Sequence, residues 1–113
     1  MHQVKEKDWK LFREKLPEWQ EAYIERLIKE YAELLAGNKA ASERFWALDK
    51  RIRADRKRLG VCVDEVSRSK LQNILTGLII ENVITEDDLQ DFSEELREST
   101  HQWMQIFHRN LEE

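Results

Sequence analysis

The sequence predicts an all-α fold, a four-helix bundle-like domain with a short extra helix at its N-terminus. Two observations lead to this class. Apolar side chains recur at helical spacing in three separate stretches, and the composition, with 37% charged residues, three Gly and one Pro, is that of a helical protein with a thin core. At 113 residues the chain can bury one core without disulfides or metal ions, so we expect a single domain over residues 1–113.

The stretch over residues 71–84, LQNILTGLIIENVI, is the most apolar part of the chain. Its large side chains follow the i, i+3, i+4, i+7, i+8 spacing of a broad helical stripe, which must be buried. We therefore expect it to form the central helix, with Asp64 as its N-cap and its end near Ile80. The stripe consists of Leu71, Ile74, Leu75, Leu78 and Ile79.

Three helices are expected before the central helix. Pro17 interrupts a heptad-like seam. Because proline removes a helical hydrogen bond and clashes with the preceding turn, we expect a short first helix to about Lys15, followed by a break or a kink. A second helix should end at Gly37, and Ser42 should cap a third helix that ends at Gly60. The seam consists of Trp9, Phe12, Leu16, Trp19 and Tyr23. The buried face of the third helix consists of Phe45, Leu48 and Ile52, with Leu59 as a further candidate.

Thr85 and Asp88 match a capping box, which predicts that the last helix spans residues 86–111. At 1.5 Å per residue this helix would be about 39 Å long, against about 25 Å for a central helix over residues 64–80. Its far end would overhang the core with apolar side chains, which should meet the N-terminal helix or a second copy of the chain. We expect a homodimer through this interface, which consists of Trp9, Phe12, Trp103, Met104, Ile106, Phe107 and Leu111.

Charge is divided unequally along the chain. Residues 1–60 hold 15 basic and 11 acidic side chains, whereas residues 61–113 hold 4 basic and 12 acidic ones. A basic patch suits a phosphate backbone and a row of carboxylates can imitate one, although a solvated surface is the favoured interpretation of both. The basic patch is Lys50, Arg51, Arg53, Arg56, Lys57 and Arg58, and the acidic stripe is Asp87, Asp91, Glu94 and Glu98.

No group of residues has the spacing of a catalytic, cofactor-binding or metal site. Ser67 and Lys70 match a Ser-x-x-Lys spacing, but the companion motifs of those serine enzymes are absent. His101 and His108 would lie about 10 Å apart along a helix, which is too far to share one ion. The single cysteine, Cys62, excludes an internal disulfide and is expected to be buried. We therefore expect a non-enzymatic protein without a cofactor or a bound metal.

The N-terminal segment is charged and lacks the apolar region of a signal peptide. No apolar run approaches the roughly 18 residues that a membrane helix needs. A single cysteine fits a reducing compartment. These features predict a cytoplasmic protein without a membrane partner.

Several short motifs spread over most of the chain are Trp9-Lys-x-Phe12, Pro17-Glu-Trp-Gln20 with Tyr23, Ser42-Glu-x-Phe-Trp46, Lys50-Arg-Ile52 with Asp55, and Ile84-Thr with Asp88-Leu89. Together they resemble a group of short uncharacterised bacterial all-helical proteins. Some members of that group carry the label "multidrug transporter", which this sequence contradicts because it has no membrane-spanning stretch. The resemblance implies a small bacterial cytosolic helical protein and transfers no functional residue.

These features predict a protein–protein interaction or regulatory module that self-associates or docks on another protein. Two alternatives stay open. One is a nucleic-acid-binding regulator that uses a basic helix over residues 50–58, and the other is an acidic inhibitor that mimics nucleic acid with the carboxylates over residues 87–98. The salt dependence of binding to duplex DNA or to a basic protein separates them from the first interpretation.

Overall fold

The computed structural model describes residues 4–112 and the side chains of residues 4–110. Among these residues it contains four α-helices: α1 (Glu6–Leu35), α2 (Ala41–Asp55), α3 (Leu71–Ile80) and α4 (Glu94–Glu112). Two short 3-10 helices, η1 (Arg68–Lys70) and η2 (Glu86–Leu89), precede α3 and α4. The described residues form no strand, which confirms the all-α class.

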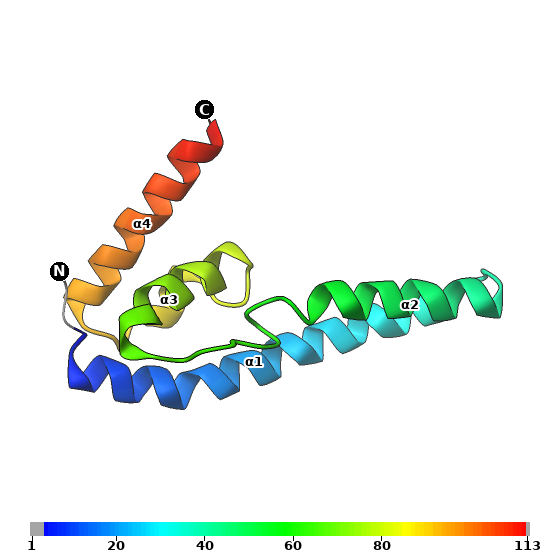
Figure 1. Cartoon of the computed structure of the whole chain (residues 1–113), viewed down its shortest axis with the longest axis horizontal. Helices are drawn as coiled ribbons and strands as arrows, with labels where there is room; N and C mark the ends of the chain where they lie inside the picture. Colours follow the sequence, from blue (N-terminus) through cyan, green and yellow to red (C-terminus); the bar gives the residue numbers. More distant parts are fainter. Residues whose placement is uncertain (1–3, 113) are drawn as a thin grey trace.

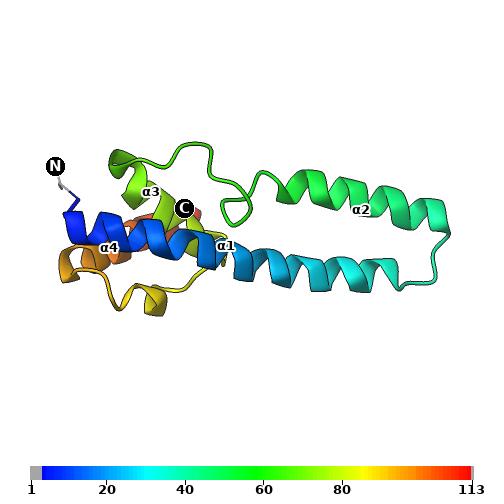
Figure 2. The ribbon, with the colours of Figure 1, turned by 90° about the horizontal axis from the view of Figure 1, so that it is seen from below.

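The helices form two parts that share α1 (Figure 1). The first half of α1 packs with α3, η2 and the start of α4 in a small core. The second half of α1 pairs with α2 in an antiparallel hairpin, residues 18–58, which extends away from that core (Figure 2). The principal extents of 54 × 36 × 23 Å therefore describe a molecule that is more extended than the bundle-like domain expected from the sequence.

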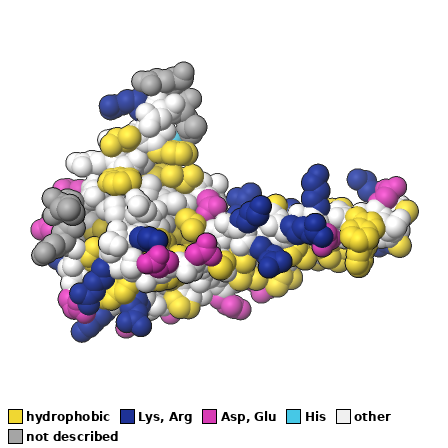
Figure 3. Space-filling model, viewed as in Figure 1, with side chains coloured by type: hydrophobic (Ala, Val, Ile, Leu, Met, Phe, Trp, Pro, Cys, Tyr) yellow, Lys and Arg dark blue, Asp and Glu magenta, His cyan; other side chains and the backbone are white. Residues whose placement is uncertain are grey.

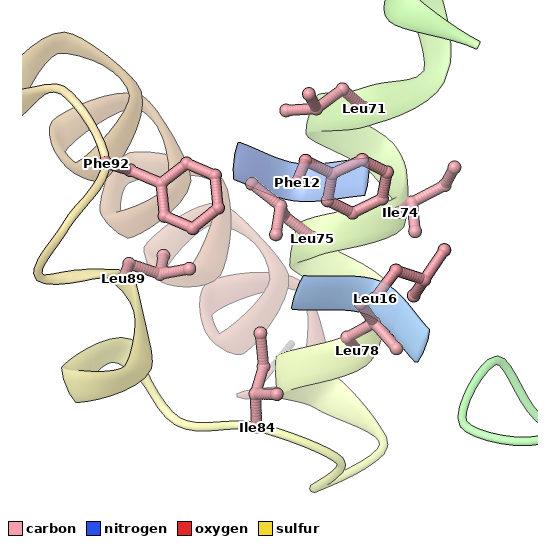
Figure 4. Packing of buried hydrophobic residues seen from close by; sticks show 9 residues of the cluster. All are labelled: Phe12, Leu16, Leu71, Ile74, Leu75, Leu78, Ile84, Leu89 and Phe92. Atoms are coloured by element: carbon pink, nitrogen blue, oxygen red, sulfur yellow. The ribbon is translucent and has the colours of Figure 1, made fainter. Parts of the chain in front are cut away.

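The core is built around α3, as the sequence predicts. The apolar stripe of this helix is almost completely buried, and Phe12 and Leu16 of α1 cover it on one side (Figure 4). The segment that follows α3 supplies the other side. The buried cluster consists of Phe12, Leu16, Leu71, Ile74, Leu75, Leu78, Ile84, Leu89 and Phe92.

The predicted break at Pro17 is wrong, because α1 is one helix of 30 residues with Pro17 inside it. The short extra N-terminal helix is therefore the first part of α1. Buried Phe12 and Leu16 precede the proline. Buried Tyr23 and Leu27 follow it. Burying a large apolar side chain stabilises the fold by about 1.5–3 kcal/mol, so four of them outweigh the cost of about 3 kcal/mol for a proline inside a helix.

The loop between α1 and α2 does not use the expected glycine and serine signals. Ser42 is not the N-cap of α2, because Ala40 occupies that position without a side-chain cap. Gly37 does not adopt a positive φ. Instead, the Arg44 guanidinium donates to the carbonyl oxygen of Leu35 at 2.8 Å and so satisfies the end of α1. A side chain of α2 therefore closes the loop.

The segment between α2 and α3 contains less helix than the sequence predicts. The helix α2 ends at Asp55 and not at Gly60, and α3 begins at Leu71 and not near Asp64. Cys62 lies in this segment and is exposed, so its predicted burial is wrong. The reason is that the chain leaves the helical path to insert residues 59–60 between α1 and α3, as described below.

The predicted capping box is present but begins a different helix. The backbone N–H of Thr85 donates to the Asp88 carboxylate at 2.7 Å, and this box caps the short η2. The long α4 begins only after Ser93, whose hydroxyl accepts a hydrogen bond from the backbone N–H of Leu96. The buried Asp8 carboxylate of α1 accepts from the backbone N–H of Ser93 at 2.9 Å, which fixes this start. The last helix therefore has 19 residues, about 28 Å, and the predicted start at residue 86 is wrong.

Leu59 and Gly60 join the hairpin to the core. The backbone N–H of Leu59 donates to the Glu81 carboxylate at 3.0 Å, and the Gln20 amide donates to the Leu59 carbonyl oxygen at 3.0 Å. Gly60 is buried against the ring of Tyr23, at a position where an added Cβ would overlap the ring. This joint therefore touches both α1 and the end of α3, and it requires a residue without a side chain.

We expect Gly60→Ala to lower the free energy of unfolding by about 1–3 kcal/mol, because the new methyl group must displace the Tyr23 ring. Urea unfolding followed by circular dichroism measures this change. Gly37→Ala is the matched control, since a Cβ there would meet only the Leu34 carbonyl oxygen at an ordinary 3.6 Å. Equal stability of the two variants would show that the joint is not close-packed.

Candidate interaction surface

The hairpin exposes large apolar side chains away from the core. Phe45, Trp46 and Ile28 are 62%, 61% and 52% exposed, and Leu35 and Ile52 are also exposed. Figure 3 shows hydrophobic side chains along this part of the molecule. The expected burial of Phe45 and Ile52 is therefore wrong, because α2 has only α1 to pack against. An apolar group of this size on a surface is typical of an interaction site.

Four of these side chains lie on one face of the hairpin. Ile28 and Leu35 are seven residues apart on α1, and Phe45 and Ile52 are seven residues apart on α2, so each pair forms a helical stripe. At about 100° per residue, each stripe lies about 80° around its own helix axis from the side that contacts the other helix. The rotation has the same sense along the chain in both helices. Because the helices are antiparallel, both stripes emerge on the same side. We call this side the apolar face.

Polar contacts hold the two helices together. Arg51 forms an ion pair with Glu30 of α1 at 3.2 Å and with Asp55 at 2.9 Å. The Tyr31 hydroxyl donates to Asp55 at 2.6 Å, and Arg58 lies 3.3 Å from the same carboxylate. Asp55 is 3% exposed, and a carboxylate so buried must be paired to be tolerated. This polar cluster therefore fixes α2 against α1.

The structure divides the interface that the sequence predicts. Phe12 and Met104 are buried within the chain and are not open to a second copy, and Trp9 packs against the core cluster. Trp103 and Ile106 are 47% and 55% exposed, and α4 rises away from α1 (Figure 1), so the N-terminal helix does not cover them. The remaining two residues are Phe107, which is half-buried, and Leu111, whose side chain lies outside the described residues.

A cleft of about 380 Å³ lies between the start of α1, the start of α3 and one side of α4. Trp103 forms part of its wall, and the buried Asp8 carboxylate, which accepts two hydrogen bonds from Ser93, lies at its base. The cations that line it, Lys5 and Arg68, form ion pairs with neighbouring glutamates at 3.4 and 2.6 Å. The charged groups of this cleft are thus engaged within the chain.

Half of the predicted basic patch is neutralised locally. Arg51 and Arg58 bind Asp55, and Arg53 binds Asp49 at 3.1 Å. Because α2 ends at Asp55, the patch also does not lie on one helix. The other three members, which form no ion pair with any side chain that the structure describes, are Lys50, Arg56 and Lys57.

The predicted acidic stripe is not one helical row, because the chain turns between η2 and α4. Glu94 and Glu98 lie on α4 and share a surface recess with Asp87 of η2. Asp91 lies in a different recess beside Lys7 of α1. The carboxylates therefore lack the regular spacing that imitation of a phosphate backbone requires.

The other motifs are engaged in short-range contacts. The Lys70 ammonium binds Glu65 at 2.7 Å and the Ser67 hydroxyl contacts another serine hydroxyl at 3.2 Å, so the two have different partners. The Nδ1 atom of His101 lies 2.9 Å from the Glu86 carboxylate. Within the described residues, no three His, Cys, Asp or Glu side chains gather closely enough to hold a metal ion.

In the described part of the chain, no helix combines the length and the apolarity needed to cross a bilayer. Comparisons of the chain with protein-family models, with curated proteins and with solved structures find no match. We therefore argue function from the geometry of this chain alone.

The apolar face is the feature that sequence reasoning missed. Its stripes have the spacing of buried helix faces, and spacing alone does not show what covers them. The available signal was chain connectivity. The loop of residues 36–40 is short enough to return α2 along the end of α1, which predicts a two-helix hairpin.

The polar cluster predicts an unusual tyrosine titration. Burial and the hydrogen bond to Asp55 raise the pKa of Tyr31 to about 12 from 10.0. Since the raised pKa favours the protonated phenol in the fold, this stabilisation is complete below about pH 10 and is lost as the pH rises through 12. Phenolate absorbance should show one tyrosine titrating late in the wild type, and that late step should be absent in Tyr31→Phe. Persistence of the late step in Tyr31→Phe would assign it to Tyr23 and contradict the cluster.

Proposed function

We propose that this protein is a non-enzymatic protein–protein interaction module that self-associates through the apolar face of its hairpin. The observation that carries the proposal is the exposure of Ile28, Leu35, Phe45 and Ile52 on one side of two helices that are fixed to each other. The polar cluster and the joint hold this face in a set orientation before any partner binds. Such preorganisation reduces the entropy that association costs. The cytoplasm is the compartment that its single cysteine favours.

Helix packing supports self-association in particular. A helical hairpin buries only the sides of its helices that face each other, so each helix keeps an apolar flank open to water. Two hairpins that stack face to face bury these flanks in the centre of a four-helix bundle. The apolar face would then become a core, which accounts for large apolar side chains at positions that a monomer leaves exposed.

The nucleic-acid alternatives have weaker support. Arg51, Arg53 and Arg58 are already paired with carboxylates of the same chain, and the acidic residues do not form one row. A protein that neutralised several phosphates would bind duplex DNA with a steep dependence on salt concentration. We expect that this protein shows no salt-dependent binding to duplex DNA.

The test is light scattering on the purified protein at chain concentrations of about 1–100 µM, the range suited to an interface of modest area. We expect the wild type to reach twice the chain mass within this range. The double variant Phe45→Glu, Ile52→Glu should remain monomeric, because four carboxylates would have to be buried in a dimer.

The matched control is Trp103→Glu, Ile106→Glu, which places the same charges on the other exposed apolar group. This variant should assemble like the wild type. If the α4 variant is monomeric and the hairpin variant assembles normally, self-association uses the end of α4 and the proposal is wrong.

A further inference from the structure

The two helices of the hairpin carry opposite charges. Residues 18–35, at the end of α1, contain five acidic and two basic side chains. Residues 41–58, which include α2, contain three acidic and seven basic side chains. Figure 3 shows the Lys and Arg side chains along the edge of the hairpin that α2 forms. The apolar face is therefore bounded by an acidic edge on one side and a basic edge on the other.

The charges nearest to the apolar face have the same arrangement. Glu21 and Glu25 precede Ile28 by seven and three residues, so they lie beside it on the outer edge of α1, and both are exposed. Arg53 and Arg56 flank the outer edge of α2 beside Ile52. Arg53 lies 3.1 Å from Asp49, but its side chain is 73% exposed and can also reach a partner, and Arg56 is exposed and forms no ion pair with any described side chain. Both pairs lie at the end of the hairpin that is closer to the core.

We infer that a second copy of this chain covers the apolar face, with α2 of each protomer against α1 of its partner. This inference rests on the proposed function and names the partner and the pairing. A two-fold axis along the length of the hairpin exchanges the acidic and basic edges, so Glu21 and Glu25 of one protomer meet Arg53 and Arg56 of the other. The contact occurs twice, and the interface closes on itself.

The other face-to-face pairing is disfavoured by charge. A two-fold axis across the hairpin would place α2 against α2 of the partner and α1 against α1. Because this axis also reverses the direction of the hairpin, Arg53 and Arg56 would meet the far end of the partner's α2, and Glu21 and Glu25 would meet the far end of the partner's α1. The acidic and basic pairs would not meet, and their attraction would be lost. Charge complementarity therefore selects the pairing of α1 with α2.

The size of the face sets the expected affinity. With 15 residues in α2, the face is about 22 Å long, and two helices make it about 20 Å wide, so it contributes roughly 440 Å² of projected area per protomer. This value lies at the low end for specific interfaces, where association is weak and reversible. Edge charges should accordingly make a measurable difference to assembly.

The experiment mixes two charge-reversed proteins. Variant A is Arg53→Glu, Arg56→Glu, and variant B is Glu21→Lys, Glu25→Lys. In the inferred pairing each variant alone places like charges together, so its dimer dissociation constant should rise at least tenfold. A mixture of A and B restores opposite charges at both contacts, and it should form an A–B dimer with an affinity near that of the wild type. Analytical ultracentrifugation measures all three.

The outcomes separate the pairing from the proposed function. If A and B each assemble like the wild type and their mixture gains nothing, the acidic and basic pairs do not meet and the inferred pairing is wrong, although self-association stands. If the wild type is monomeric throughout, a second copy is not the occupant. Glu33→Lys and Lys50→Glu, which reverse charges away from the apolar face, are the controls and should leave assembly unchanged. Restored assembly in the mixture also shows that A and B are folded.

Discussion

A helix of 30 residues spans about 45 Å, and the small core of this chain covers only part of that length. Phe12 and Leu16, the α1 side chains in the core cluster, come from its first half. Beyond Leu27 the helix has only α2 beside it. A two-helix pair leaves an apolar flank of each helix open, so the exposed face follows from the length of α1. That length depends in turn on packing strong enough to carry the helix through Pro17.

The joint between the two parts determines where the open face points. Leu59 lies against Gly77 of α3, where an added side chain would collide with it, and so the joint is close-packed on this side as well. Arg26 of α1 donates to the carbonyl oxygen of Asn82 at 2.6 Å, and Asn82 adopts a positive φ of 62° at the end of α3. These contacts tie the base of the hairpin to the core and present the apolar face in one orientation.

Sequence patterns predicted the parts of this fold that depend on local periodicity. The stripe from Leu71 to Leu78 is the buried centre, and the Thr85 capping box is present. The errors occurred where long-range contacts override local signals. Pro17 does not break α1, because burial on both sides of it outweighs the lost hydrogen bond. The last helix begins after Ser93, because Asp8, which is 85 residues away in sequence, fixes that start.

The candidate site was less accessible to sequence reasoning than the fold. Stripes such as Phe45 and Ile52 predict burial, but the arrangement of the whole chain determines which partner buries them. The interface predicted at the end of α4 combined residues that the structure separates, since Phe12 and Met104 are buried while Trp103 and Ile106 are exposed. Which of these residues are buried depends on where α4 begins and on the direction in which it leaves the core. The periodicity of the sequence predicts neither.

The most direct test of the account is amide hydrogen exchange measured as a function of protein concentration. If a second copy covers the hairpin, the amides of residues 24–35 and 41–55 should gain protection as the concentration rises, while those of α3 should remain protected throughout. If the exchange protection of the hairpin amides does not change with concentration, the account is contradicted, because the hairpin would then be as stable in the monomer as in a dimer.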